Sequence, residues 1–127
     1  MHNFRRFTIG CAGLLLASCA SQVAFHGPIS LASDQQIVVV QASAKFKKNG
    51  ILVGGDVRRT NGYAGSVPGH LHVEGLSANG NVIAATDAPW GEFMSRRFRL
   101  AYFKAFLATP NGASIASIRV TSVTDSR

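Results

Sequence analysis

Two histidines and a glutamate alternate along a short apolar segment, at His70, His72 and Glu74. Because a β-strand sends every second side chain to the same face, a strand here places all three on one face, about 7 Å apart. Imidazole and carboxylate groups bind zinc and copper, so one interpretation is a metal site that takes a fourth ligand from elsewhere, such as His26. The favoured interpretation is the polar face of an amphipathic strand, because exposed histidine pairs need no ligand.

The segment from residue 95 to residue 104 combines basic and aromatic side chains. Arg97 and Arg99 share one face of a predicted strand, next to Arg96. Guanidinium groups bind phosphate and carboxylate groups through paired hydrogen bonds, so these three arginines are candidate partner-binding residues. The alternative is that they form a solvated rim, while the other face of the strand builds the core. That other face consists of Phe98, Leu100 and Tyr102.

Trp90 follows Pro89 and precedes Gly91, so we expect it in a loop between strands. An exposed tryptophan there would anchor a protein partner or a sugar ring, which makes Trp90 a further candidate partner-binding residue. The favoured alternative is that the indole closes the open end of the fold.

Motifs for catalysis are absent from the sequence. It contains no Gly-x-Ser-x-Gly, no His-Glu-x-x-His and no glycine-rich phosphate loop, and the only cysteines are Cys11 and Cys19. The 6 acidic residues are scattered, so no carboxylate pair has a defined separation. We therefore expect no enzymatic activity and assign no catalytic residue.

Near the N-terminus, Arg5 and Arg6 precede an apolar stretch that closes with Leu16-Ala17-Ser18-Cys19. A charged segment, a short apolar run and small residues are typical of an export signal, and this run is too short to span a bilayer. Leu16-Ala17-Ser18-Cys19 resembles the lipobox of bacterial lipoproteins. The resemblance implies a signal peptide over residues 1–18 and a diacylglycerol on the Cys19 thiol, which anchors the chain in a membrane.

Ala20, and not an aspartate, follows Cys19, and in the lipoproteins that the motif resembles this implies the outer membrane, facing the periplasm. The alternative is cleavage near Ala20 by the ordinary signal peptidase, which would release a soluble periplasmic protein. Residues 19–127 keep 11 of the 13 basic residues and all 6 acidic residues, a net charge of +5. This balance favours an anionic envelope partner, and nucleic acid is a poor candidate outside the cytoplasm.

Short stretches with period-two alternation recur along residues 36–127, separated by turn signals such as Asn49-Gly50 and Asn79-Gly80. Six or seven such strands predict an all-β fold, an antiparallel β-sandwich of immunoglobulin-like or fibronectin-III-like type, with a small β-barrel as the alternative. Residues 19–35, in which polar and turn-forming residues show no sustained period, are expected to hold the lipidated cysteine and a linker.

Glycine and valine recur in the strands beside two of these turn signals. Val53-Gly54-Gly55-Asp56-Val57, together with Asn79-Gly80-Asn81-Val82-Ile83, resembles the strands of small bacterial sandwich domains, and Gly54-Gly55 predicts a bulge or a close backbone approach. In the strand before it, alternation predicts one buried face. That face consists of Val38, Val40, Ala42, Ala44 and Phe46.

These observations predict a membrane-anchored envelope lipoprotein that acts as a binding or scaffold module for a protein partner or an anionic surface. The basic face from Arg96 to Lys104 is its expected contact surface. The alternative function is a periplasmic zinc- or copper-binding module built on His70, His72 and Glu74; no other cofactor is expected.

Overall fold

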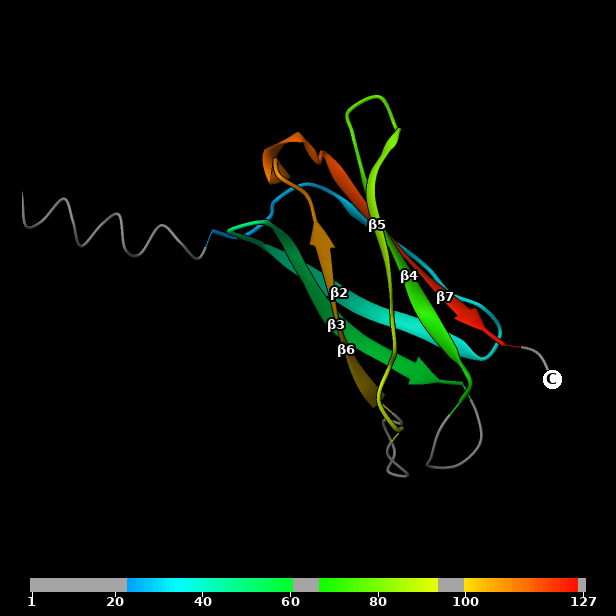
Figure 1. Ribbon diagram of the computed structural model, residues 1–127. Helices are drawn as coiled ribbons and strands as arrows, with labels where there is room; N and C mark the ends of the chain where they lie inside the picture. Colours follow the sequence, from blue (N-terminus) through cyan, green and yellow to red (C-terminus); the bar gives the residue numbers. More distant parts are fainter. Residues whose placement is uncertain (1–22, 61–66, 94–99, 126–127) are drawn as a thin grey trace, which may run out of the picture.

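Two β-sheets packed face to face form the protein in the computed structural model, which describes residues 23–60, 67–93 and 100–125 (Figure 1). The described residues form seven strands and one 3₁₀ turn, η2 (Gly112–Ser114). The strands are β1 (Ile29–Ala32), β2 (Ile37–Lys47), β3 (Gly50–Arg59), β4 (Gly69–Leu76), β5 (Val82–Ala88), β6 (Leu100–Ala108) and β7 (Ser117–Thr124). One sheet has the order β1-β7-β4-β5 and the other the order β2-β3-β6, so the predicted sandwich is confirmed over a small barrel.

The core lies between the two sheets and draws on the inward faces of both. Its largest fully buried side chains are Phe93, Ile37, Ile51, Leu71, Leu107 and Ile118. Alternation places the strand residues of this set inward, as expected for a two-layer β-fold, and Phe93 joins them from the segment between β5 and β6. Across the described ranges, no helix has the length and hydropathy needed to cross a bilayer.

A β-bulge at Val40 changes which side chains of β2 are buried. The pairing with β3 passes from Val39 to Gln41 without a partner for Val40, and this extra residue reverses the alternation. Ile37 and Val39 are therefore buried, whereas Val40 is 45% exposed and Val38 only partly buried. The predicted inward placement of Val38 and Val40 is wrong, because a one-residue bulge exchanges the two faces of a strand. Beyond the bulge the prediction is confirmed.

A close backbone approach lies opposite this bulge, at Gly55 of β3. A Cβ atom at Gly55 would overlap the carbonyl oxygen of Gln41, so the two backbones fit only without a side chain there. A Cβ at Gly54 would make ordinary contacts, the nearest 3.4 Å away at the Phe103 carbonyl oxygen. The glycine pair therefore marks the predicted close approach, while the bulge itself lies on the partner strand.

The buried face of β6 differs from the expected one. Ala101, Phe103 and Ala105 point into the core with Leu107, whereas Tyr102 is 63% exposed. The prediction that Leu100 and Tyr102 build the core is wrong, and Phe98 lies outside the described residues. Nearly every position of this strand is apolar, so the pattern of polar and apolar residues does not identify the buried face. The space between the sheets holds the small side chains of Ala101 and Ala105.

The chain ahead of residue 36 is part of the sandwich where it is described. Phe25 donates a backbone hydrogen bond to the Ala44 carbonyl at 2.9 Å, and its buried ring lies 5.9 Å from that of Phe46. The strand β1 then pairs with β7 in parallel. The expected linker therefore holds a strand that crosses from one sheet to the other, because two apolar residues, Phe25 and Ile29, reach the core on either side of Gly27-Pro28.

Candidate functional site

The predicted histidine–glutamate face is present on the four-stranded sheet. His70, His72 and Glu74 point outward from β4, while Leu71 and Val73 between them are fully buried. The predicted amphipathic strand is therefore confirmed.

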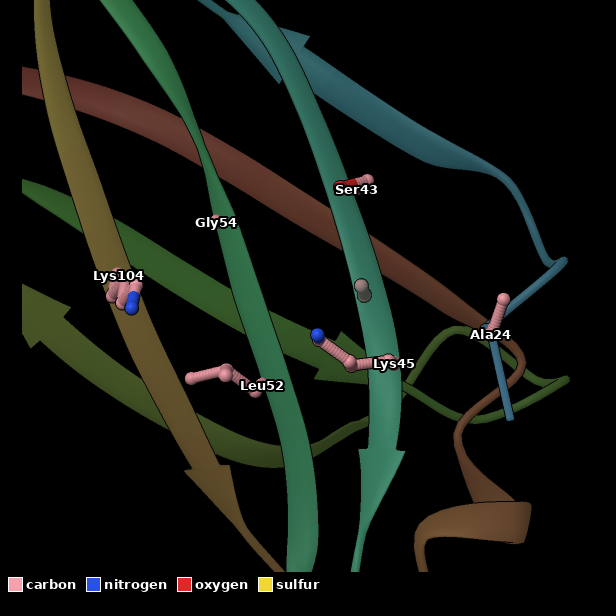
Figure 2. A pocket seen from close by; sticks show the side chains of 7 residues that line it. Ala24, Ser43, Lys45, Leu52, Gly54 and Lys104 are labelled. Carbon is pink, nitrogen blue, oxygen red and sulfur yellow. The ribbon is translucent and has the colours of Figure 1, made fainter. Parts of the chain in front are cut away.

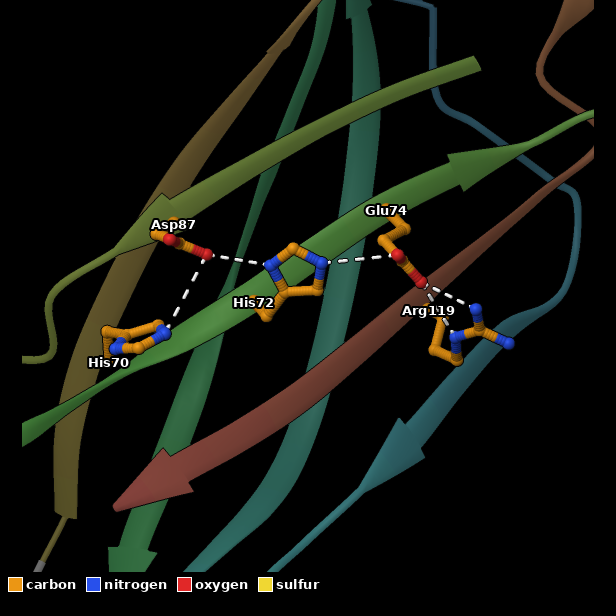
Figure 3. A network of polar contacts seen from close by, with 5 residues as sticks. All are labelled: His70, His72, Glu74, Asp87 and Arg119. Atoms are coloured by element: carbon orange, nitrogen blue, oxygen red, sulfur yellow. Dashed lines mark hydrogen bonds and ion pairs between the residues drawn. The ribbon is translucent and has the colours of Figure 1, made fainter. Parts of the chain in front are cut away.

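A chain of polar contacts joins these residues to both neighbouring strands (Figure 3). His72 Nδ1 lies 2.7 Å from an oxygen of Asp87 on β5, and His72 Nε2 lies 3.2 Å from Glu74 Oε2. The other Glu74 oxygen accepts hydrogen bonds from the guanidinium of Arg119 on β7, at 2.9 and 2.6 Å. His70 Nε2 lies 3.8 Å from the same Asp87 oxygen.

The electrostatics of this network favour ionised side chains. The hydrogen bond with Asp87 is the largest cause that raises the pKa of His72, and Glu74 adds to it. Arg119 lowers the pKa of Glu74, and the hydrogen bond with His72 lowers the pKa of Asp87. Both carboxylates therefore favour the protonated form of His72, in which its two ring N–H groups donate to them, and one of the carboxylates also accepts from a guanidinium.

The geometry does not fit a metal ion. A metal requires a deprotonated imidazole nitrogen, and both nitrogens of His72 face carboxylates that favour its protonated form. Arg119 also occupies the Glu74 oxygen that points away from His72. Within the described residues, no group of three or more His, Cys, Asp or Glu side chains is arranged to hold a metal. His70, His72 and Glu74 thus form an ion-pair network on the sheet surface.

Trp90 is a core residue and not a surface anchor. Its side chain belongs to the buried set at 8% exposure, and its indole Nε1 donates a 2.9 Å hydrogen bond to the Val67 carbonyl. Its ring lies 6.3 Å from that of Phe93. The assignment of Trp90 to partner binding is therefore wrong, because the indole is spent on closing the sandwich.

The outer face of the three-stranded sheet has a different chemistry. Strand pairing arranges its side chains in three successive rows across β2, β3 and β6. The first row is Gln41, Asp56 and Tyr102; the second is Ser43, Gly54 and Lys104; the third is Lys45, Leu52 and Phe106. Because Gly54 has no side chain and Ser43 a short one, the middle row is low over β2 and β3, whereas Lys104 stands at its β6 end.

A shallow trough follows this middle row across the strands, and Figure 2 shows side chains that line part of it. It consists of two adjoining hollows of about 380 and 670 Å³, and both are lined by Ser43, Gly54 and Lys104. The smaller hollow extends to Ala24 beyond the β2 edge, and the larger one extends to Pro89 beyond the β6 edge. We call the three rows with these two end residues the trough face.

Basic and aromatic side chains surround the trough. Tyr102, which lines the larger hollow, is 63% exposed, and Phe106, in the row beyond Lys104, is 42% exposed. Among the described residues, neither Lys45 nor Lys104 forms an ion pair, and the nearby acid, Asp56, accepts a 2.8 Å hydrogen bond from Gln41. Arg58 continues the same outward face next to Leu100. The trough face is therefore basic and unneutralised, unlike the paired charges of the opposite sheet.

Sequence reasoning found only part of this surface. It placed Lys104 on a basic face, but Arg96, Arg97 and Arg99 lie outside the described residues. It missed Lys45 and the trough, because both depend on β3 lying between β2 and β6. Gly54-Gly55 was the one available signal, since a glycine on an outward position of a strand removes a side chain from its surface.

Comparisons with family models, curated proteins and solved structures find no match to this chain.

Proposed function

We propose that this protein is a cell-envelope binding module, held at the membrane by a lipid on Cys19, whose trough face binds an anionic partner. The observation that carries the proposal is the pair of lysines, Lys45 and Lys104, which flank an open trough and have no ion-pair partner among the described residues. An anionic ligand supplies the missing counter-charge, and the exposed rings of Tyr102 and Phe106 offer apolar contact beside it.

The contrast between the two sheets supports this assignment. On the four-stranded sheet, Glu74 and Asp87 are already paired with Arg119 and His72, so an incoming anion would compete with partners held in place. On the trough face it would meet free ammonium groups. The net charge of +5 on residues 19–127 would also draw anionic lipids and polymers toward the domain.

Replacing both Lys45 and Lys104 with glutamine is expected to weaken binding of polyglutamate, a linear anionic polymer, roughly thirtyfold at low salt. The estimate assumes about 1 kcal/mol for each lysine beside an anionic surface. The Kd would be measured by titration calorimetry with the mature lipoprotein in neutral detergent. Wild-type binding should also weaken as salt rises, because exposed charges are screened.

The matched control changes the net charge equally on the opposite sheet. Ser30→Glu with Val82→Glu removes the same two units of charge at exposed positions of β1 and β5. We expect its Kd to stay within about threefold of the wild type, since longer distances in salt screen the added charges. Equal losses in the two double variants would mean that net charge alone governs binding, and this would overturn the assignment to the trough face.

A further inference from the structure

The shape of the trough restricts what can lie in it. It crosses three strands, about 10 Å from β2 to β6, and extends past both edges of the sheet to Ala24 and Pro89. Tyr102 lines the larger hollow, whereas Phe106, four residues later on β6 and about 13 Å along the strand, is not among the residues that line either hollow. The two hollows therefore cross the whole sheet and extend past both of its edges, and this suits an elongated chain better than a compact group.

The polar groups along the trough suit a chain rich in hydroxyl groups. Ser43 can donate and accept, the Gln41 amide can do both, and the Asp56 carboxylate accepts while it is held by Gln41. The exposed ring of Tyr102 adds a flat apolar surface next to these groups. Hydroxyl groups on a ring with an apolar face match this combination, because they can donate to Asp56 while the ring packs on Tyr102.

A peptide matches the trough less well. Extended peptides bind sheets at their edges, where unpaired backbone groups can extend the ladder. The floor of the trough is the face of a sheet in which β3 is paired on both sides, so a peptide backbone finds no ladder to join. A lipid headgroup is also a poorer match, because one compact phosphate would fill only a part of the two adjoining hollows.

We infer that the trough is a binding site for an acidic polysaccharide, with sugar rings lying across Gly54 against Tyr102 and acidic groups next to Lys45 and Lys104. This inference rests on the proposed function and deepens it from an anionic partner to a class of ligand. Gly54 is central to it, because any side chain at this position would fill the floor on which a ring lies.

The test compares two linear polyanions of equal length with the mature lipoprotein in neutral detergent: polygalacturonate, which has sugar rings, and polyglutamate, which does not. We expect polygalacturonate to bind at least tenfold more tightly. Gly54→Val and Tyr102→Ala should each weaken polygalacturonate at least tenfold and polyglutamate less than twofold, and Tyr102→Phe should retain tight binding because it keeps the ring. Ala85→Val, an equal kind of enlargement at an exposed position of β5, should change neither Kd.

Each failure has its own signature. If both polymers bind equally and Gly54→Val changes neither Kd, the polysaccharide inference is overturned while the anionic face stands. If only vesicles of phosphatidylglycerol bind, tested with the Cys19→Ser chain so that no lipid anchor inserts, the ligand is a phosphate headgroup and the inference is again overturned. If Lys45→Gln with Lys104→Gln alters no binding, the proposed function itself fails. Circular dichroism melts of Gly54→Val and Tyr102→Ala exclude unfolding as the cause of a loss.

Discussion

Gly55→Ala is expected to destabilise the protein by about 3 kcal/mol, even though it adds a single methyl group. The new Cβ would overlap the Gln41 carbonyl oxygen, and it would also approach the Ala42 Cα to 2.9 Å. Both atoms belong to the backbone of β2, so relief requires that the paired strands separate at the bulge. Thermal unfolding followed by circular dichroism should show a midpoint lowered by more than about 10 °C.

Gly54→Ala is the matched control for this prediction, one residue away on the same strand. Its Cβ would make only ordinary contacts, so the free energy of unfolding should be unchanged or higher by up to about 1 kcal/mol, since glycine weakens a strand. Equal destabilisation by both substitutions would show that the loss comes from glycine flexibility in general. In that case the close approach at Gly55 would not be the reason for its presence.

The faces of a strand were predictable from the sequence where polar and apolar residues alternate strictly. In β4, buried Leu71 and Val73 alternate with His70, His72 and Glu74, and the prediction is confirmed. In β6, apolar residues fill almost every position, and only the space between the sheets selects Ala101 and Phe103 for the inside. Periodicity carries no information when both phases are apolar.

The bulge in β2 shows a second limit. Val40 follows three other apolar residues, so nothing local marks it as the residue without a partner on β3. Its position depends on Gly55, which is fifteen residues later and allows the strands to approach. The pairing of β2 with β3 therefore decides which side chains of β2 face the core, and the sequence of β2 alone does not predict it.

The candidate site was less predictable than the fold, because it is made by neighbours in space. The ion-pair network needs Asp87 from β5 and Arg119 from β7 on either side of β4, and these partners turn a metal-like pattern into a set of paired charges. The trough likewise needs Ser43, Gly54 and Lys104 in one row. Both the network and the trough therefore depend on the strand order, which the sequence did not determine.

Asp34→Ala is expected to lower the free energy of unfolding by about 2–4 kcal/mol, because one carboxylate joins three parts of the chain. One of its oxygens accepts backbone hydrogen bonds from Gln36 and Ile37, at 2.9 and 2.8 Å, where β2 begins. The other accepts from the backbone N–H and the hydroxyl of Thr124, at the end of β7. Asp34 lies in the segment expected to be a linker, and its carboxylate joins this segment to the start of β2 and the end of β7.

The pH dependence of stability distinguishes the contribution of the ionised Asp34 carboxylate from that of the backbone turn. Burial raises the pKa of Asp34, but hydrogen bonds from Thr124, Ile37 and Gln36 outweigh it and lower the pKa below its ordinary value of 3.8. A lowered pKa in the folded state stabilises the protein above the unfolded-state pKa, and this contribution is lost as pH falls through the folded-state value. Asp34→Asn, which keeps the size of the side chain, should therefore be less stable than the wild type near neutral pH.

The difference in the free energy of unfolding between the wild type and Asp34→Asn should become smaller as pH falls from about 5 to about 2, because the wild-type carboxylate becomes protonated. Urea unfolding at several pH values measures it directly, with Asp125→Asn as the control, since Asp125 is an exposed carboxylate near the same end of β7. If the difference in the free energy of unfolding does not change with pH, the charge of Asp34 contributes nothing to stability. A narrowing difference would instead show that an ionised Asp34 joins the start of β2 to the end of β7.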